Sequence, residues 1–323
     1  MAIHFSKRYI KMLTPSYVIR NYSPDDFERF MEFLNDAYMD MYFPDRWESA
    51  PQFFQQKQGF PGYSPEKHLF LADWKGKIVG YADISPEPQI GRVILNGLVS
   101  VYHRREGVAN KMMKSTLARA AKLGFKIAHV CVSEKNAAAR GLLSGAGFSA
   151  VRHLHELEIG LKDMPEEDFD WGTLEISSLL PGEEALLTQA QNRCFTGTWG
   201  FCPNTVEEVV YYFSLTGSTP KDVLVAKEEE RIVGYCWTNL IVGWGKRNVQ
   251  KKGRVHMLGV DPDYRRKGIG KNLLKAGLYY LKRREADAVE LTADKGNADA
   301  YALYRSLGFQ MKSVNLWYEK RLK

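Results

Sequence analysis

The chain repeats itself at a constant spacing, and this repeat limits the possible folds more than any other feature. The hexapeptide RREGVA at 104–109 returns as RRKGIG at 265–270, which is 161 positions later. Five more residues recur at the same spacing: Asn136, Ala139, Leu142, Gly147 and Phe148 return as Asn297, Ala300, Leu303, Gly308 and Phe309. Such self-similarity indicates two tandem copies of one folding unit.

The copies differ in length ahead of this block. The tetrapeptide IVGY at 78–81 returns at 232–235, only 154 positions later, so the second copy carries about seven extra residues. We expect them in or near the polar run 245–253, because hairpin loops tolerate insertions. An acidic, proline-containing stretch near 160–172 predicts the boundary between the copies. The expected organisation is an extension at 1–15, a first domain at 16–160, a linker at 161–172 and a second domain at 173–323.

Each copy has the same pattern of elements. A short strand precedes a helix that begins at Ser23-Pro24-Asp25-Asp26 in the first copy, where serine suits the N-cap and proline the first turn. A polar turn then divides two β-rich runs, and a third strand leads to the RRxGxx turn and its helix. A strand, a helix and a final strand pair complete the copy. This order predicts an α/β (α+β) fold with a mixed, mostly antiparallel sheet flanked by helices.

Composition narrows the function classes. The 323 residues carry a net charge of +7, yet no continuous basic block, so a phosphate-bearing cofactor explains the arginine clusters better than nucleic acid does. No apolar run reaches the length of a bilayer span, and no signal peptide is recognisable. The spacings of the four cysteines fit neither a metal site nor a disulfide framework. We expect a cytoplasmic protein with free thiols, without a metal, nucleic-acid or membrane partner.

The RxxGxx turn suggests the kind of ligand. Its glycines allow a tight turn and a close approach of the backbone, and the N–H groups at the following helix start attract an anion. Arg265, Arg266 and Lys267 add positive charge. A pyrophosphate suits this arrangement, although a glycine turn before a helix is common and does not by itself define a ligand.

The second half makes the assignment more specific. The segments VDPDYRRKGIGKNLL and ADKGNADAYALYRSLGF resemble the GNAT acetyltransferase superfamily. The tandem copies and the segment FTGTWGF resemble the mycothiol-synthase type within it. The resemblance implies that the turn binds the pyrophosphate of coenzyme A, that Asn297 lies near the pantetheine arm, and that Tyr304 lies near the thioester sulfur. The implied cofactor-binding residues are Leu258, Gly259, Val260, Arg265, Arg266, Lys267, Gly268, Ile269, Gly270, Lys271, Asn297 and Tyr304, with Leu98, Val99, Arg104, Arg105, Gly107, Val108, Ala109 and Asn136 in the first copy.

The resemblance also implies direct acetyl transfer from acetyl-CoA to an amine. A backbone N–H near 258–260 would polarise the thioester carbonyl, and Tyr304 would protonate the leaving thiolate. The glutamate usual in this family four residues before Leu258 is Arg254 here. Simple strand alternation places His256 on the face of Arg254 and Leu258, which makes it a candidate base. Two alternatives are a packed, inert histidine and a base that acts through water. Asn297 can serve as a helix N-cap as well as a ligand.

The copies are not equivalent in chemistry. The position that corresponds to Tyr304 is Leu143, which has no proton to donate. Ser100 and Val101 stand where the second copy has Asp261 and Pro262. We therefore expect a catalytic second domain and a degenerate first domain. Whether the first domain binds coenzyme A is left open.

Two aromatic segments follow the first helix of each copy, at 38–48 and 195–201. We expect them to line the acceptor site, with core or interdomain packing as the alternative. Acidic residues in the first segment suit a cationic amine. The expected acceptor is a small-molecule or peptide amine, and the chain is expected to be a monomer or homodimer. The alternative function is a non-catalytic coenzyme A-binding or regulatory module.

Overall fold

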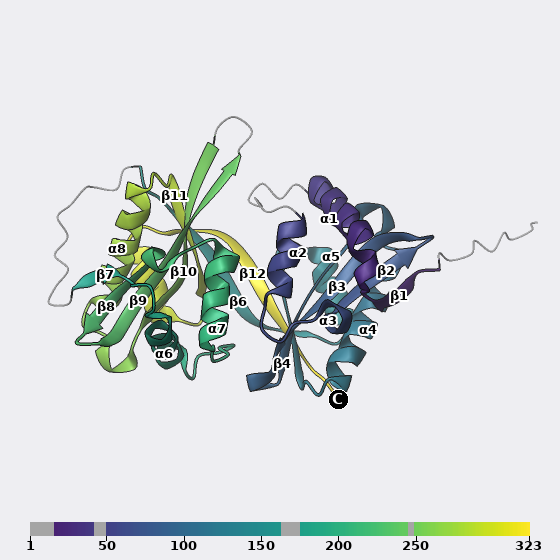
Figure 1. Cartoon of the computed structure of the whole chain (residues 1–323), viewed down its shortest axis with the longest axis horizontal. Helices are drawn as coiled ribbons and strands as arrows, with labels where there is room; N and C mark the ends of the chain where they lie inside the picture. Colours follow the sequence, from purple (N-terminus) through teal and green to yellow (C-terminus); the bar gives the residue numbers. More distant parts are fainter. Residues whose placement is uncertain (1–15, 42–49, 163–174, 245–248) are drawn as a thin grey trace, which may run out of the picture.

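One continuous sheet runs through both copies. The computed structural model describes residues 16–41, 50–162, 175–244 and 249–323. Twelve strands form the sheet in the order β1-β2-β3-β4-β5-β12-β6-β11-β10-β9-β8-β7. Figure 1 shows the two halves side by side, the first copy around β1–β5 and the second around β7–β11. The mixed sheet, mostly antiparallel and flanked by helices, confirms the expected fold class.

The elements follow the expected order in each copy. The strands are β1 (Val18–Asn21), β2 (Leu69–Trp74), β3 (Lys77–Glu87), β4 (Arg92–Val99), β5 (Ile127–Ser133), β6 (Ser149–Gly160), β7 (Ile176–Ser178), β8 (Val223–Glu228), β9 (Arg231–Trp244), β10 (Val249–Val260), β11 (Ala288–Asp294) and β12 (Gln310–Arg321). The α-helices are α1 (Phe27–Met41), α2 (Ala50–Gln58), α3 (Pro65–His68), α4 (Val108–Lys122), α5 (Ala137–Gly145), α6 (Glu184–Phe195), α7 (Val206–Thr216), α8 (Ile269–Arg283) and α9 (Ala298–Ser306). A 3₁₀ turn at Pro24–Asp26 leads into α1, where the sequence predicts the helix start.

The last strands of the two copies are exchanged. β12 of the second copy pairs with β5 of the first, and β6 of the first pairs with β11 of the second. β6 and β12 also pair with each other, and Figure 1 shows them crossing between the halves. The expectation of a final strand pair within each copy is therefore wrong. Each copy ends in one strand, which finds its partners in the other copy.

The extra residues of the second copy lie in the β9–β10 hairpin, as expected. β9 has 14 residues where β3 has 11, and β10 has 12 where β4 has 8. The insertion thus lengthens both strands by a total close to the seven residues inferred from the repeat spacing. Part of the run 245–253 lies outside the described residues, as do the extension 1–15 and most of the linker 161–172.

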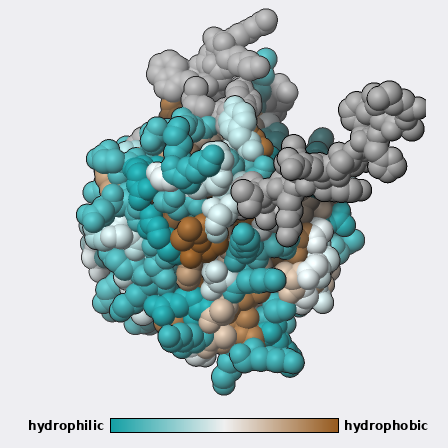
Figure 2. Space-filling view, turned by 90° about the vertical axis from the view of Figure 1, so that its right-hand side faces the viewer, coloured by the Kyte–Doolittle hydropathy of each residue, from teal (hydrophilic) through white to brown (hydrophobic). Residues whose placement is uncertain are grey.

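Helices cover the two faces of the sheet in matching pairs. Helices α8 and α9 bury one core and α4 and α5 another on the same face, while α1 with α2 and α6 with α7 cover the opposite face. The end of the molecule formed by the first copy is mostly hydrophilic, with small hydrophobic areas (Figure 2). The four cysteines are free thiols, as expected. Among the described residues, no helix has both the length and the apolar character needed to span a membrane.

Candidate active site

The two RRxGxx turns have the same backbone shape. Arg105 and Gly107 adopt φ values of 67° and 81°, and Arg266 and Gly268 adopt 66° and 82°. Such left-handed residues direct neighbouring N–H groups to one side and form a concave anion site. A Cβ built on Gly268 meets no atom within 4 Å, so the glycine satisfies its φ and leaves the space over the turn open. Both turns fit a pyrophosphate.

Arg265 stabilises the second turn through hydrogen bonds to backbone carbonyls. Its Nε donates to the Val260 carbonyl at 3.1 Å, and its Nη2 donates to the Cys194 carbonyl at 2.8 Å. Arg104 repeats the first contact, because its Nε donates to the Val99 carbonyl at 3.3 Å. These arginines tie the turn to the end of the preceding strand and so hold the N–H groups in position.

Three other cations of the second turn are exposed. Arg266 lies 3.3 Å from the Asp299 carboxylate at the start of α9, and 82% of its side chain is exposed. Lys267 lies over the Tyr264 ring, 4.7 Å from its centroid. Lys271 follows on the first turn of α8 and is also exposed. A phosphate over the turn would therefore be surrounded by positive charge.

The first residues of α8 and α4 anchor these helices to the sheet. Ile269 and Val108 are buried in their cores. Gly270 follows Ile269, and a Cβ there would lie 3.3 Å from the Val260 side chain. The first copy has Ala109 at this position. Glycine at position 270 therefore avoids a tight contact between the turn and the end of β10.

In both copies the strand before the turn separates from its parallel neighbour. β10 pairs with β11 only as far as Val255 and Leu291, and β4 pairs with β5 only as far as Ile94 and His129. Residues 258–260 pair with β9 alone. β11 therefore does not pair with residues 258–260, and the Val260 carbonyl accepts from Arg265 instead.

β10 contains a β-bulge that β4 does not have. The register with β9 shifts between Val255 and Met257, leaving His256 as the extra residue. In the first copy, β3 and β4 pair without a shift through Leu98 and Val99. A bulge bends a strand and redirects its side chains, and bulges are frequent beside active sites. The second copy alone therefore has this feature.

The bulge corrects the expected arrangement of three side chains. Arg254 pairs with Asn239, and Leu258 pairs with Cys236. Because Asn239 and Cys236 are three residues apart on a regular strand, Arg254 and Leu258 point to opposite faces. The expectation that Arg254, His256 and Leu258 share one face is wrong, since alternation fails at the bulge.

His256 is poorly suited to act as a base. Its Nε2 is buried and has no hydrogen-bond partner among the described residues. Burial and, second, the charge of Arg254 lower the pKa of His256 to about 4. The ring is neutral at pH 7, but a base with this pKa accepts protons weakly there. Its role as base stays a prediction, and the lowered pKa counts against it.

Tyr304 lies on α9 in the core that covers the second copy's separated strands. Its ring packs edge-on against Phe309, with 6.0 Å between centroids. Leu258 and Leu291, from the two separated strands, belong to or pack against the same core. Burial, followed by the nearby Cys236, raises the pKa of Tyr304 to about 12. The phenol therefore carries its proton at neutral pH, as a proton donor must.

The first copy matches this geometry except for the bulge and the phenol. Leu143, at the corresponding position of α5, is fully buried in the first copy's core. Asn136 and Asn297 both cap their helices, accepting hydrogen bonds from the Ala139 and Ala300 N–H groups at 3.0 and 3.1 Å. The capping role of Asn297 is confirmed, and it fixes the side chain at the start of α9, shortly after β11 ends at Asp294.

Comparison with known proteins agrees with this geometry. The profile of the acetyltransferase (GNAT) family matches residues 27–148 and 185–309. The chain belongs to the GNAT acetyltransferase family. A mycothiol acetyltransferase of Stackebrandtia nassauensis is 26% identical over 80% of this chain and 84% of its own length. Another, from Thermomonospora curvata, is 28% identical over 76% and 79%.

Solved structures of GNAT proteins share the fold. A GCN5-related N-acetyltransferase from Sphaerobacter thermophilus has a TM-score of 0.68 at 21% identity, with 95% of this chain and 96% of that chain covered. A tandem GNAT protein from the clavulanic acid biosynthesis pathway has the same TM-score at 14% identity, with 95% and 99% covered. These similarities confirm two GNAT folds in one chain.

The FTGTWGF segment of this GNAT protein contacts the other copy. Trp199 stacks on His129 of β5 at 5.2 Å between centroids and lies 5.3 Å from the Arg152 guanidinium of β6. Arg92 of β4 donates to the Gly200 carbonyl at 2.6 Å. The alternative of interdomain packing therefore holds for Trp199. Of the other aromatic segment, 42–49 lie outside the described residues.

Sequence reasoning missed a polar group beside the gap between β10 and β11. Arg254, Thr292, Glu156 and Asn315 lie on adjacent strands and contact one another through their side chains. Glu156 belongs to the first copy. Nothing in the local pattern signals this group, because it depends on the strand exchange.

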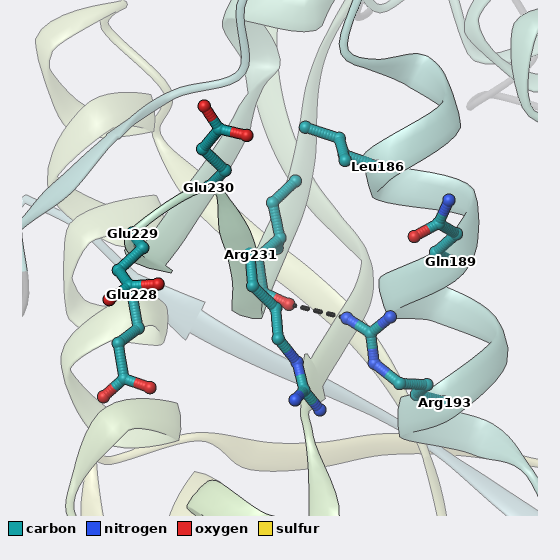
Figure 3. Close-up of a pocket in the computed structure, with 8 residues that line it drawn as sticks. Leu186, Gln189, Arg193, Glu228, Glu229, Glu230 and Arg231 are labelled. Atoms are coloured by element: carbon teal, nitrogen blue, oxygen red, sulfur yellow. Dashed lines mark hydrogen bonds between the residues drawn. The ribbon is translucent and has the colours of Figure 1, made fainter.

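A pocket of about 500 Å³ lies at the turn between β8 and β9 (Figure 3). Arg193 of α6 points into it and donates to the Ile232 carbonyl at 3.0 Å, and Glu228 to Glu230 form the opposite side. Arg193 and Arg231 both bind Asp261, just ahead of the second turn. None of the predicted site residues lines this pocket, so we assign it to the support of the turn.

Proposed function

We propose that this chain is an acetyl-CoA-dependent N-acetyltransferase that moves an acetyl group to a primary amine by direct transfer. The second copy is the catalyst. The observation that carries the proposal is the buried Tyr304, which lies in the core that Leu258 of the bulged strand packs against. The first copy has Leu143 and a regular strand in the corresponding places, so it lacks both features.

The proposed domains are residues 16–160 and 173–323, joined at 161–172 and preceded by 1–15. Each domain keeps its own core and its own turn. β6 and β12 complete the sheet across the boundary. The domains are thus one structural unit, in which the degenerate copy has a supporting role even without catalysis.

The residues present fit acetyl-CoA. The left-handed turn at Arg266 and Gly268, with Lys267 and Lys271 beside it, suits the pyrophosphate. The gap between β10 and β11 offers unpaired backbone to the pantetheine amides. The bound cofactor would supply an acetyl group activated as a thioester.

In this site the chain's own groups have three tasks. The backbone N–H in the region of Leu258 donates to the acyl oxygen and stabilises the charge that develops there. Asn297, held by its cap, lines the entrance. Tyr304 gives its proton to the sulfur as the carbon–sulfur bond breaks.

The acceptor class follows from the family and the relatives. The relatives are named mycothiol acetyltransferase, and one protein of similar fold is described as a glucosamine N-acetyltransferase region. We propose a primary amine on a small molecule or a peptide. Amino sugars therefore head the set of acceptors to test.

A transfer assay tests the proposal. The purified chain is incubated with acetyl-CoA and glucosamine, spermidine or a peptide with a free N-terminal amine, and released thiol and acetylated amine are both measured. Equal amounts of the two products support the proposal. Gly268→Trp should abolish transfer, while Gly107→Trp should leave the transfer rate within about threefold of the wild type. Tight binding of acetyl-CoA without transfer to any amine would favour the non-catalytic coenzyme A-binding alternative.

A further inference from the structure

The strand exchange brings a carboxylate of the first copy to the second copy's site. The last pair between β10 and β11 is Val255 with Leu291. Thr292 is the next residue on β11, and its partner on β6 is Glu156. Glu156 thus stands at the point where the two strands separate, one strand further along the sheet.

One carboxylate oxygen of Glu156 is held in place and the other is not. Oε1 accepts hydrogen bonds from the Thr292 hydroxyl at 2.9 Å and from the Asn315 amide at 3.2 Å. Oε2 accepts none from the described residues, and the Arg254 Nη2 lies 3.9 Å away. The side chain is 19% exposed, so water or a ligand can reach it. This combination fixes the carboxylate and leaves an oxygen for an incoming group.

Glu156 and Tyr304 lie on opposite faces of the sheet. Leu157 and Leu291 belong to the core that contains Tyr304. Their neighbours Glu156 and Thr292 point the other way, because side chains alternate along a strand. A thioester held in the gap would have the phenol on one side and the carboxylate on the other. An amine that attacks the planar thioester carbonyl from the carboxylate's side would approach past Glu156.

We infer that Glu156, contributed by the degenerate copy, is the proton acceptor for the amine acetylated in the second copy. The inference rests on the proposed function and adds the base that its mechanism lacks. The acceptor ammonium loses one proton to Glu156, which passes it to water. The amine nitrogen bonds to the acyl carbon, the carbon–sulfur bond breaks, and the sulfur takes its proton from Tyr304. The second nitrogen-bound proton restores Tyr304, so charge and atoms balance.

Two rival groups are less suited to this task. His256 is buried at the bulge, and its pKa is lowered to about 4. Glu158, two residues along the same strand and face, pairs with Lys312 at 2.9 Å and Lys252 at 3.6 Å. The charged or titratable groups around Glu156 are Arg254 on β10, Cys131 on β5, and the network of Glu158, Glu290, Lys252 and Lys312.

Glu156→Gln tests the inference, because glutamine keeps an oxygen for Thr292 and Asn315 but cannot accept a proton. The matched control is Glu158→Gln. Both variants and the wild type are assayed with acetyl-CoA and an amine that the wild type acetylates. We expect Glu156→Gln to lower kcat/KM about 10²-fold, the low end for general-base catalysis. The kcat/KM of Glu158→Gln should stay within about threefold of the wild-type value.

Chemical rescue separates proton transfer from support of the fold. Formate should restore part of the activity of Glu156→Ala, with melting temperature unchanged by the added formate. An active wild type together with a Glu156→Gln variant whose kcat/KM stays within about threefold of it overturns the inference and leaves the proposed function intact. A loss of about 10²-fold in His256→Asn but not in Glu156→Gln overturns the inference in favour of the histidine. A wild type that acetylates no amine removes the proposed function and this inference with it.

Discussion

The hydroxyl of Thr292 donates a 2.9 Å hydrogen bond to Oε1 of Glu156, and these two residues belong to different copies of the repeat. The contact lies within a ladder that runs from Ala288 with Gly160 to Asp294 with Leu154. β12 then joins the same ladder to β5. The fold of each copy therefore depends on a strand from the other.

Separating the copies should prevent the second from folding. A fragment of residues 173–323 lacks β6, which exposes an edge of β11 and of β12, and unpaired edges promote aggregation. We expect this fragment to be insoluble or to lack a cooperative melting transition by circular dichroism. Co-expression with residues 1–172 should restore a soluble complex. A monomeric, cooperatively folding fragment would contradict the exchange.

Trp199 should contribute to the stability of the whole chain. It stacks on His129 of β5 and meets Trp317 of β12 edge-on at 6.0 Å, so it joins the segment after α6 to the first copy's strand β5. We expect Trp199→Ala to lower the free energy of unfolding by about 2 kcal/mol, below the cost for a fully buried tryptophan. Urea denaturation measures this. Trp199→Phe should lower the free energy of unfolding by less than half as much. Equal decreases in the two variants would argue against a stacking contribution.

Substitutions at two glycines can separate the effect of backbone strain on stability from an effect on cofactor binding. Gly268 and Gly124 have similar φ values, 82° and 87°, and a Cβ at either meets no atom within 4 Å. Gly268→Ala and Gly124→Ala should therefore each cost about 1 kcal/mol in stability. Only Gly268→Ala should weaken acetyl-CoA binding in calorimetry, because it alters the anion-binding turn. Equal affinities in both variants would place the pyrophosphate elsewhere.

Asp26 should make the first copy sensitive to acid. It accepts hydrogen bonds from Arg20 and from the Ser23 N–H, and mainly the Arg20 contact lowers the pKa of Asp26 to about 2. A lowered carboxyl pKa stabilises the fold above pH 4, and this contribution is lost as the pH falls through 2. We expect Asp26→Asn to lower the free energy of unfolding by about 1–2 kcal/mol at pH 7. This range allows for the partial exposure of Arg20, which weakens the ion pair. The difference from wild type should shrink below pH 4 in chemical denaturation, and a constant difference would contradict this origin.

The architecture of each copy was largely predictable from the sequence. The repeat spacing located the turns, the capping asparagines and the lengthened hairpin, because these features depend on local residue types. The resemblance placed Tyr304 on the helix where the structure has it, and Leu143 signalled the difference between the copies.

Other features depend on strand pairing and were not predictable. Alternation put His256 with Arg254 and Leu258, but the bulge breaks that alternation without a glycine or proline to mark it. The strand exchange has no local signature either, since β6 and β12 alternate in the same way whichever copy they join. Glu156 could therefore not be associated with the second copy's site.

The central claim is that Tyr304 of the second copy protonates the departing thiolate. The direct measurement is kcat for acetyl transfer by Tyr304→Phe, with affinity for acetyl-CoA measured alongside. Tyr301→Phe is the matched control, because Tyr301 lies on the same helix and its hydroxyl contacts His155 at 3.3 Å. We predict a fall in kcat of about 10²-fold for Tyr304→Phe with unchanged affinity, and little change for Tyr301→Phe. Wild-type turnover by Tyr304→Phe would contradict the account.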